Sequence, residues 1–254
     1  MNSARFKQTK SPPPCGEVEA RSASSGGYSR HRPPTRLTSF ADLPTGGRSW
    51  GAFIVALVVL ISSAPAWAAP VKILALGTSL TQGYGLPPGT EIPAVLQTEL
   101  KKKGIDATVI NAGVSGDTSA GGLSRLDWSL ADHPNAAMIE LGSNDALRGI
   151  DPASTEKNLT AILTKLKAQH IPVLLLGMQA PKNFGSEYEA KFNAIYPKLA
   201  KAFGTLYYPF ILDGVALNPK LNQKDGIHPN PTGVKIIVGK ILPDVMKLAA
   251  EAKH

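Results

Sequence analysis

From Pro70 onward, short apolar runs alternate with longer amphipathic stretches. The short runs are rich in Val, Ile and Leu, which predicts buried strands at residues 71–76, 107–110, 136–141, 172–176 and 205–208. The stretches between them have helical spacing and predict helices at residues 92–103, 121–130, 154–169, 187–202 and 231–250. Apolar strands that alternate with helices predict an α/β fold, in which one parallel sheet is covered by helices on both faces.

The first 68 residues have a different pattern. Residues 1–48 are rich in Ser, Pro, Gly and Arg, so we expect a disordered leader or a translation start that lies further downstream. Residues 49–68 have the order of a secretory signal, with an apolar run and then Ala66-Trp67-Ala68 as an A-x-A cleavage site. A membrane anchor is the alternative, but the apolar core of about 12 residues is shorter than the roughly 20 that span a bilayer. We expect cleavage after Ala68, a periplasmic or secreted folded domain at residues 69–254, and no stable membrane anchor in the mature form.

Composition narrows the class of protein. Hydrophobic residues make up 43% of the chain and aromatic residues only 6%, which suits a core of Ala, Leu, Ile and Val. The net charge of +8 suggests nucleic acid, but residues 1–68 hold 8 Lys/Arg against 3 Asp/Glu, whereas residues 69–254 hold 19 against 16. The folded part is only mildly basic, so we expect no nucleic-acid partner. The single cysteine, Cys15, lies in the leader, which excludes an internal disulfide, a thiol nucleophile and a thiolate metal site from the mature domain.

Polar clusters follow the predicted strands. Residues 77–79 follow the first strand, residues 111–118 the second and residues 142–145 the third, and residues 225–228 lie in the loop before the last helix. In open α/β sheets the active site forms at the carboxyl ends of the strands. We therefore expect these four clusters to meet at one edge of the sheet.

Ser79, His228 and Asp225 are the candidate catalytic residues. A serine hydroxyl attacks a carbonyl well only when a histidine accepts its proton, and a carboxylate fixes the tautomer of that histidine. His228 has Asp225 three residues before it and Pro229 directly after it. The alternatives are that Ser79 merely caps a helix and that His228 is a solvated loop residue with Asp225 in a turn. A metal site would need further ligands at usable spacing, and the sequence offers none near His228.

Gly116 and Asn144 are candidates for an oxyanion hole. A glycine lets the backbone N–H approach a developing oxyanion, and an asparagine amide donates a hydrogen bond without charge. Taken alone, Gly116 could be a turn glycine and Asn144 a cap residue. Four polar clusters expected at the same edge of a sheet are harder to explain as turns and caps than any one of them alone, which favours a shared site.

These blocks resemble the SGNH-hydrolase superfamily, also called the GDSL esterases and lipases, and within it the bacterial periplasmic multifunctional acyl-ester hydrolases. The resemblance runs from about residue 71 to residue 241, and its specific stretches are residues 75–81, 111–122, 141–145, 194–200 and 225–230. It implies a flavodoxin-like three-layer α/β/α sandwich with a five-stranded parallel sheet. It also implies Ser79, Asp225 and His228 as the triad, the N–H of Ser79, Gly116 and Asn144 as the oxyanion hole, and no metal or organic cofactor. Two positions depart from the family pattern: Thr78 stands in place of the usual Asp before the serine, and Ser143 in place of a usual Gly.

The resulting hypothesis is an exported serine hydrolase that cleaves small acyl-ester or lipid-like substrates through an acyl-enzyme, as an arylesterase, lysophospholipase or thioesterase does. The alternatives are a carbohydrate O-deacetylase on the same fold, and a non-catalytic exported binding protein. The mature chain keeps only Trp128 as a tryptophan, so an aromatic platform for sugars is sparse. The sequence leaves open the acyl length, the preference for ester or thioester, and the oligomeric state.

Overall fold

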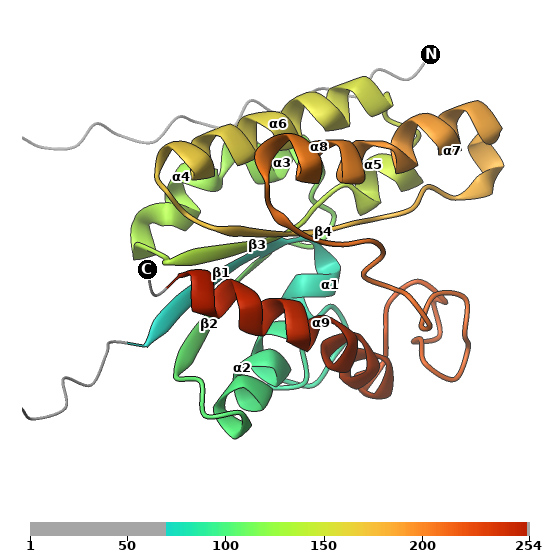
Figure 1. The fold of residues 1–254 in the computed structure, drawn as a ribbon. Coiled ribbons are helices and arrows are strands. Elements are labelled where there is room, and N and C mark those ends of the chain that lie inside the picture. Colours follow the sequence, from blue (N-terminus) through green and yellow to red (C-terminus); the bar gives the residue numbers. More distant parts are fainter. Residues whose placement is uncertain (1–69, 253–254) are drawn as a thin grey trace, which may run out of the picture. The chain divides into compact units, whose positions relative to one another are not determined.

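The computed structural model describes residues 70–252, and the following account concerns these residues. The predicted leader, the signal segment and the cleavage site after Ala68 lie outside the described residues. Figure 1 shows a sheet in the middle with helices on each side.

The sheet has five parallel strands in the order β2-β1-β3-β4-β5. The strands are β1 (Val71–Gly77), β2 (Ala107–Gly113), β3 (Ala136–Glu140), β4 (Val173–Leu176) and β5 (Leu206–Tyr208). This order is that of flavodoxin-like doubly wound sheets, so the predicted fold class is confirmed. The order reverses between β1 and β3, and in such sheets the crevice at that point holds the ligand.

Helices cover both faces of the sheet, as Figure 1 shows. One face carries α1 (Ser79–Gln82), α2 (Ile92–Lys102) and α9 (Pro231–Glu251). The other face carries α3 (Ser119–Ser124), α4 (Leu126–Ser129), α5 (Ser143–Leu147), α6 (Pro152–Ala168), α7 (Ser186–Asn193) and α8 (Ile195–Phe203). The short 3-10 helices η1 (Leu130–Asp132) and η2 (Lys182–Phe184) complete the described elements.

Burial explains why the central strands read as continuous apolar runs. Every residue of β3 and β4 is buried, since helices pack on both sides of them. The largest fully buried side chains, Tyr196 and Phe192, come from the layer that holds α7 and α8. The remaining core is almost wholly aliphatic, as the composition indicates.

Two of the predicted helices are each divided in two. The predicted helix at 121–130 is α3 followed by α4, with Arg125 at a non-helical φ of -102° and ψ of 5° between them. The predicted helix at 187–202 is α7 followed by α8, separated at Ala194. Pro197 lacks an N–H, so it cannot bond the carbonyl four residues earlier, at the end of α7. The short helices α1 and α5 were not predicted, because a single helical turn has too few residues to show a periodicity.

Candidate active site

Ser79 is the first residue of α1, directly after β1 and the cap residue Thr78. The Thr78 hydroxyl accepts the Leu80 N–H at 3.5 Å, so Thr78 caps the helix and the Ser79 side chain is left for another contact. Ser79 Oγ lies 2.9 Å from His228 Nε2. The alternative in which Ser79 serves as the cap is therefore wrong.

His228 joins Ser79 to Asp225. Its Nδ1 lies 2.7 Å from Asp225 Oδ2, on the side of the ring opposite the contact with Ser79. Both contacts are satisfied when the ring proton is on Nδ1, because Nδ1 then donates to the carboxylate and Nε2 accepts from the serine hydroxyl. The structure thus brings together the three residues predicted as a triad, in an order that suits nucleophilic attack.

Asp225 is itself held by the turn that it begins. Its Oδ1 accepts the backbone N–H of His228 at 3.0 Å and of Ile227 at 2.9 Å. The N–H bond from His228, together with the contact to its ring, lowers the pKa of Asp225 from 3.8 to about 2. Gly226 makes this tight turn possible with a φ of 72°. Asp225 therefore acts as a turn residue and as the partner of the imidazole at once.

The loop that carries His228 is fastened to the loop after α1. The side chain of Gln223 donates to the Tyr84 carbonyl at 2.7 Å and to the Pro229 carbonyl at 3.0 Å. The ring of Tyr84 packs on the imidazole of His228, with centroids 4.7 Å apart. These contacts hold a histidine that lies 149 residues from the serine in the chain.

The predicted oxyanion residues lie on the loops after β2 and β3. Gly116 has a φ of 79°, which explains why this turn needs a glycine. Asn144 lies in α5, and its amide donates to the Asp117 carbonyl at 2.8 Å, so the two loops are in contact. Among the hydrogen bonds of residues 70–252, the N–H groups of Ser79 and Gly116 have no acceptor.

Sequence reasoning missed two buried carboxylates beneath these loops. Glu140 ends β3 at 1% exposure and accepts the N–H of Thr78 at 2.8 Å and the hydroxyls of Thr78 and Thr81. Burial raises the pKa of Glu140, and the hydrogen bonds from the two threonines oppose this rise. A lone charged residue at the end of an otherwise apolar strand was the signal that could have indicated it.

Asp145 is the second buried carboxylate, and it lies next to Asn144. It is 1% exposed and accepts the Ser119 N–H at 2.8 Å, the Ser119 hydroxyl, and the Thr155 hydroxyl at 3.1 Å. These bonds join α5 to the start of α3 and to α6. Asn144 is therefore held by its neighbour in the sequence as well as by its own amide.

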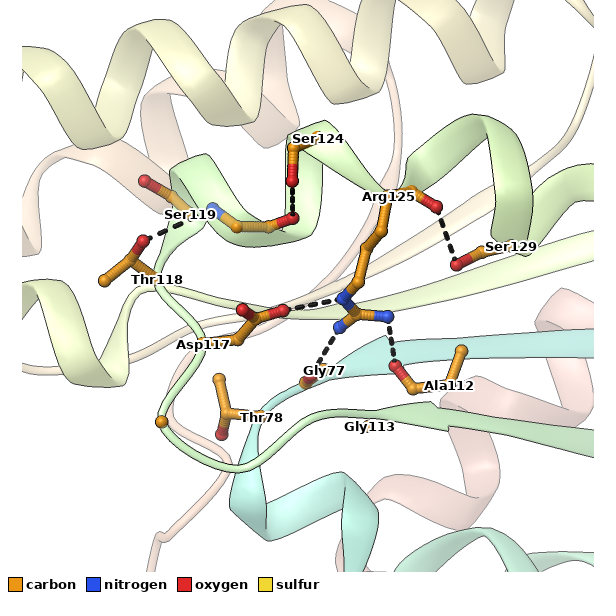
Figure 2. A network of polar contacts seen from close by, with 12 residues as sticks. Gly77, Thr78, Ala112, Gly113, Asp117, Thr118, Ser119, Ser124, Arg125 and Ser129 are labelled. Atoms are coloured by element: carbon orange, nitrogen blue, oxygen red, sulfur yellow. Dashed lines mark hydrogen bonds and ion pairs between the residues drawn. The ribbon is translucent and has the colours of Figure 1, made fainter. Parts of the chain in front are cut away.

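Arg125 connects the ends of two strands to the loop that contains Gly116 (Figure 2). Its guanidinium donates to the Gly77 carbonyl, the Ala112 carbonyl and the Asp117 carboxylate. The Arg125 and Asp117 side chains are only 17% and 18% exposed. Sequence reasoning placed Arg125 inside a helix and gave it no role.

The loop after β3 is supported from below by aromatic side chains. Tyr196 is fully buried, and its hydroxyl donates to the Leu141 carbonyl at 2.9 Å. Gly142, the next residue, has a φ of 108°, and a Cβ there would lie 2.1 Å from the Tyr196 hydroxyl. Burial raises the pKa of Tyr196 well above its usual value, so the hydroxyl remains a donor.

The described residues hold neither a metal-binding cluster nor a membrane-spanning helix. Between residues 70 and 252 there is no group of three or more His, Cys, Asp or Glu side chains placed to hold a metal ion. Over the same residues, no helix combines the length and the apolar character that crossing a membrane requires.

Comparison with known proteins places the chain among ester hydrolases. The profile of the GDSL-like lipase/acylhydrolase family matches residues 75–236. Thioesterase 1/protease 1/lysophospholipase L1 of Escherichia coli K12 is 44% identical over 164 residues, covering 64% of this chain and 77% of the relative. The arylesterase of Vibrio mimicus is 36% identical over 195 residues, covering 76% and 98%. The crystal structure of the SGNH-hydrolase family esterase AlinE4 superposes with a TM-score of 0.60 at 47% identity, covering 70% of this chain and 96% of that one.

Proposed function

Because the chain belongs to the GDSL-like lipase/acylhydrolase family and is a carboxylic ester hydrolase, we propose that it cleaves acyl esters through a covalent intermediate on Ser79. The observation that carries this proposal is the unbroken line of contacts from Ser79 Oγ to His228 and on to Asp225. A serine, an imidazole and a carboxylate in this order are the parts that nucleophilic acyl transfer needs.

In the first half of the reaction, Ser79 Oγ attacks the carbonyl carbon of the ester while His228 Nε2 accepts the hydroxyl proton. The carbonyl oxygen becomes an oxyanion in the tetrahedral intermediate. When the intermediate collapses, the bond to the leaving group breaks, and the imidazolium returns the proton to the departing alkoxide or thiolate. The acyl group is then an ester of Ser79.

In the second half, water takes the place of the serine hydroxyl as nucleophile. His228 removes a proton from the water as it attacks the acyl carbon, and then protonates Ser79 Oγ as the acid leaves. Asp225 keeps the imidazole in the required tautomer and stabilises the imidazolium. Since the pKa of Asp225 is about 2, this residue stays a carboxylate at neutral pH.

The oxyanion would be stabilised by the N–H groups of Ser79 and Gly116 and by the amide of Asn144. The two backbone donors have no acceptor among the described residues, which leaves them free for the substrate. One hydrogen of the Asn144 amide bonds the Asp117 carbonyl, and the second remains for the oxyanion. Each such donor is worth about 100-fold or more in rate.

The surroundings of Ser79 suit an apolar acyl group. Tyr84, Val114, Leu147 and Ile227 are large hydrophobic side chains that are 43% to 51% exposed, and each contacts a proposed site residue or lies within three positions of one. Trp128 is 78% exposed, but it lies in α4, which leads through η1 to the amino end of β3, away from the site. The arrangement favours esters that have an apolar acyl group over acetyl esters of sugars as substrates.

We also propose that the enzyme is exported. Residues 49–68 carry the features of a cleaved signal, namely the apolar run after Arg48 and the Ala66-Trp67-Ala68 site. Amino-terminal sequencing of the protein recovered from the periplasm or medium of an expressing bacterium would test this. A mature chain that begins at Ala69 is expected, and a chain retained in the cytoplasm with its leader would contradict it.

Hydrolysis of p-nitrophenyl esters from acetyl to palmitoyl by the purified full chain tests the enzymatic proposal. Ser79→Ala is expected to lower kcat on the order of a million-fold. Ser154→Ala, which changes an exposed serine in the first turn of α6, is the matched control and should behave as wild type. An optimum at acetyl, together with release of acetate from acetylated glycans, would favour the deacetylase. Full activity in Ser79→Ala would overturn the mechanism.

A further inference from the structure

The loop that carries Gly116 has little apolar anchorage. Val114, Ser115 and Gly116 are all exposed. Backbone bonds run from the Asp117 N–H to the Val114 carbonyl at 3.2 Å and from the Val114 N–H to the Gly77 carbonyl at 3.0 Å, and Arg148 donates to the Gly116 carbonyl at 2.9 Å. A loop of this kind moves easily unless polar contacts hold it. Polar contacts therefore set its position, and on the side of the loop that faces α3 these contacts are made by Asp117.

Arg125 supplies the strongest of these contacts (Figure 2). Its Nε donates to Asp117 Oδ2 at 2.6 Å, its Nη1 to the Ala112 carbonyl at 2.7 Å and its Nη2 to the Gly77 carbonyl at 2.8 Å. Gly77 lies two residues before Ser79, and Ala112 lies four residues before Gly116. One rigid guanidinium thus fixes the distance between the turn that carries the serine and the loop that carries the glycine.

Asp117 passes this constraint on to Asn144. Its side chain is held by Arg125, and its backbone carbonyl accepts one hydrogen of the Asn144 amide at 2.8 Å. Because the amide is planar, fixing one hydrogen also fixes the direction of the other. A shift of Asp117 would therefore turn the donor proposed for the oxyanion.

The backbone near Arg125 is shaped to admit this ion pair. A Cβ at Gly121 would lie 2.2 Å from Asp117 Oδ1, so the glycine leaves the space that the carboxylate fills. We propose that Arg125, acting through Asp117, is a positioning residue of the oxyanion hole. This inference rests on the function proposed above, and it adds a group that touches neither substrate nor reacting atoms.

The variant Arg125→Lys tests whether Arg125 acts by positioning the loop or only by its positive charge. Lysine keeps the positive charge, but its single ammonium cannot reach three acceptors that the planar guanidinium bonds at once. We expect kcat to fall about tenfold to a hundredfold while KM stays within about twofold, because only transition-state stabilisation is lost. Asp117→Asn keeps an acceptor for Nε without the charge, and it should lie between Arg125→Lys and wild type.

The matched control is Asp127→Asn. Asp127 lies two residues from Arg125 and pairs with Lys165 at the surface, where its side chain is 76% exposed. Asp127→Asn removes the same charge as Asp117→Asn, but it leaves the loop that carries Gly116 unchanged. The control should keep the wild-type kcat and KM.

Active sites are first titrated with a fluorophosphonate that labels Ser79, so that kcat refers to folded, competent enzyme. A trifluoromethyl ketone then reports the oxyanion hole, because Ser79 adds to it reversibly and gives a tetrahedral oxyanion. Its inhibition constant in Arg125→Lys should rise by the same factor by which kcat/KM falls. A role confined to stability would lower the number of titrated sites and leave both quantities per site unchanged.

A kcat per titrated site within about twofold of wild type in Arg125→Lys would overturn the inference, as would a loss that appears wholly in KM. If Arg125→Lys does not fold, Asp117→Asn decides by the same criteria. A wild-type chain that neither hydrolyses esters nor reacts at Ser79 would overturn the proposed function and this inference with it. An active wild type beside an unaffected Arg125→Lys would overturn this inference alone.

Discussion

Thr78 donates its hydroxyl hydrogen bond to Glu140, across the paired ends of β1 and β3. The two Glu140 oxygens lie 2.9 and 3.0 Å from Thr78 Oγ1, and Gly77 is the register partner of Glu140 in the sheet. Thr78 occupies the position at which the family motif usually has aspartate. The residue before the serine is therefore in contact with a buried carboxylate. A charged side chain at this position would change the net charge around Glu140.

Thr78→Asp tests this contact. The new carboxyl group would face Glu140 in a buried site, and two carboxylates at this distance cannot both ionise, so one of them binds a proton. The pKa of the pair is raised above the unfolded value of about 4. The stability of the variant relative to wild type should therefore be highest below pH 4 or so and fall as the pH rises through the raised pKa.

Urea unfolding of Thr78→Asp and wild type across the pH range measures this difference. Thr78→Ser is the control, because serine keeps the hydroxyl donor, and its difference from wild type should not change with pH. A pH-independent difference for Thr78→Asp would show that the two carboxyl groups do not share a proton.

Asp225→Asn is expected to remove most of the activity. Asparagine keeps the shape and can still accept the backbone N–H groups of Ile227 and His228, but it no longer carries the charge that stabilises the imidazolium. We expect kcat to fall on the order of a thousandfold to ten-thousandfold with little change in KM. Steady-state kinetics on a p-nitrophenyl ester at pH 7 measures this, and a loss below about tenfold would contradict the role given to Asp225.

The difference in stability between wild type and Asp225→Asn should depend on pH. The pKa of Asp225 is lowered in the folded state to about 2, from 3.8. The stability that the carboxylate contributes is therefore complete above about pH 4 and is lost as the pH falls toward 2. Wild type should be more stable than Asp225→Asn at pH 7, and this advantage should shrink at pH 2 in thermal unfolding. An advantage that is equal at both pH values would show that the carboxylate charge is not its source.

Tyr84 should affect catalysis through the packing of its ring on His228. Removing the ring in Tyr84→Ala frees the imidazole to rotate, and we expect kcat/KM to fall about threefold to tenfold, as for the loss of one aromatic pair. Tyr84→Phe keeps the ring and should match wild type. Equal losses in both variants would mean that the hydroxyl, rather than the ring, is what matters.

The architecture was predictable because its signals are local. The apolar runs that became β1 and β3 are buried on both faces, and this burial leaves a plain pattern in the sequence. The contact of Ser79, His228 and Asp225 was predictable because Asp225 and His228 lie three residues apart and Ser79 follows a strand. Parallel strands put their polar ends at one edge, so the meeting of these residues required no knowledge of the side-chain contacts.

The residues beneath the site were not predictable by the same reasoning. Glu140 and Arg125 each bind partners that are distant in the sequence, at Thr78 and at Gly77. A single charged residue has no periodicity, and Arg125 fits a helical pattern until its side chain is seen to reach the strand ends. The non-helical backbone of Arg125 also divides the predicted helix into α3 and α4. Arg125 is therefore both the residue whose contacts were not predicted and the position at which the helix breaks.

The loop after β3 packs against Tyr196 at Gly142, and this close contact can be tested by substitution. Gly142→Ala would place a methyl group 2.1 Å from the Tyr196 hydroxyl and force alanine into a φ of 108°. Tyr196→Phe removes the clash in the double variant but leaves the unfavourable φ, which alone costs about 1 to 3 kcal/mol. We therefore expect Gly142→Ala to be strongly destabilising in urea unfolding, and Tyr196→Phe to restore only part of the loss. Full restoration in the double variant would show that steric contact, and not backbone conformation, requires the glycine.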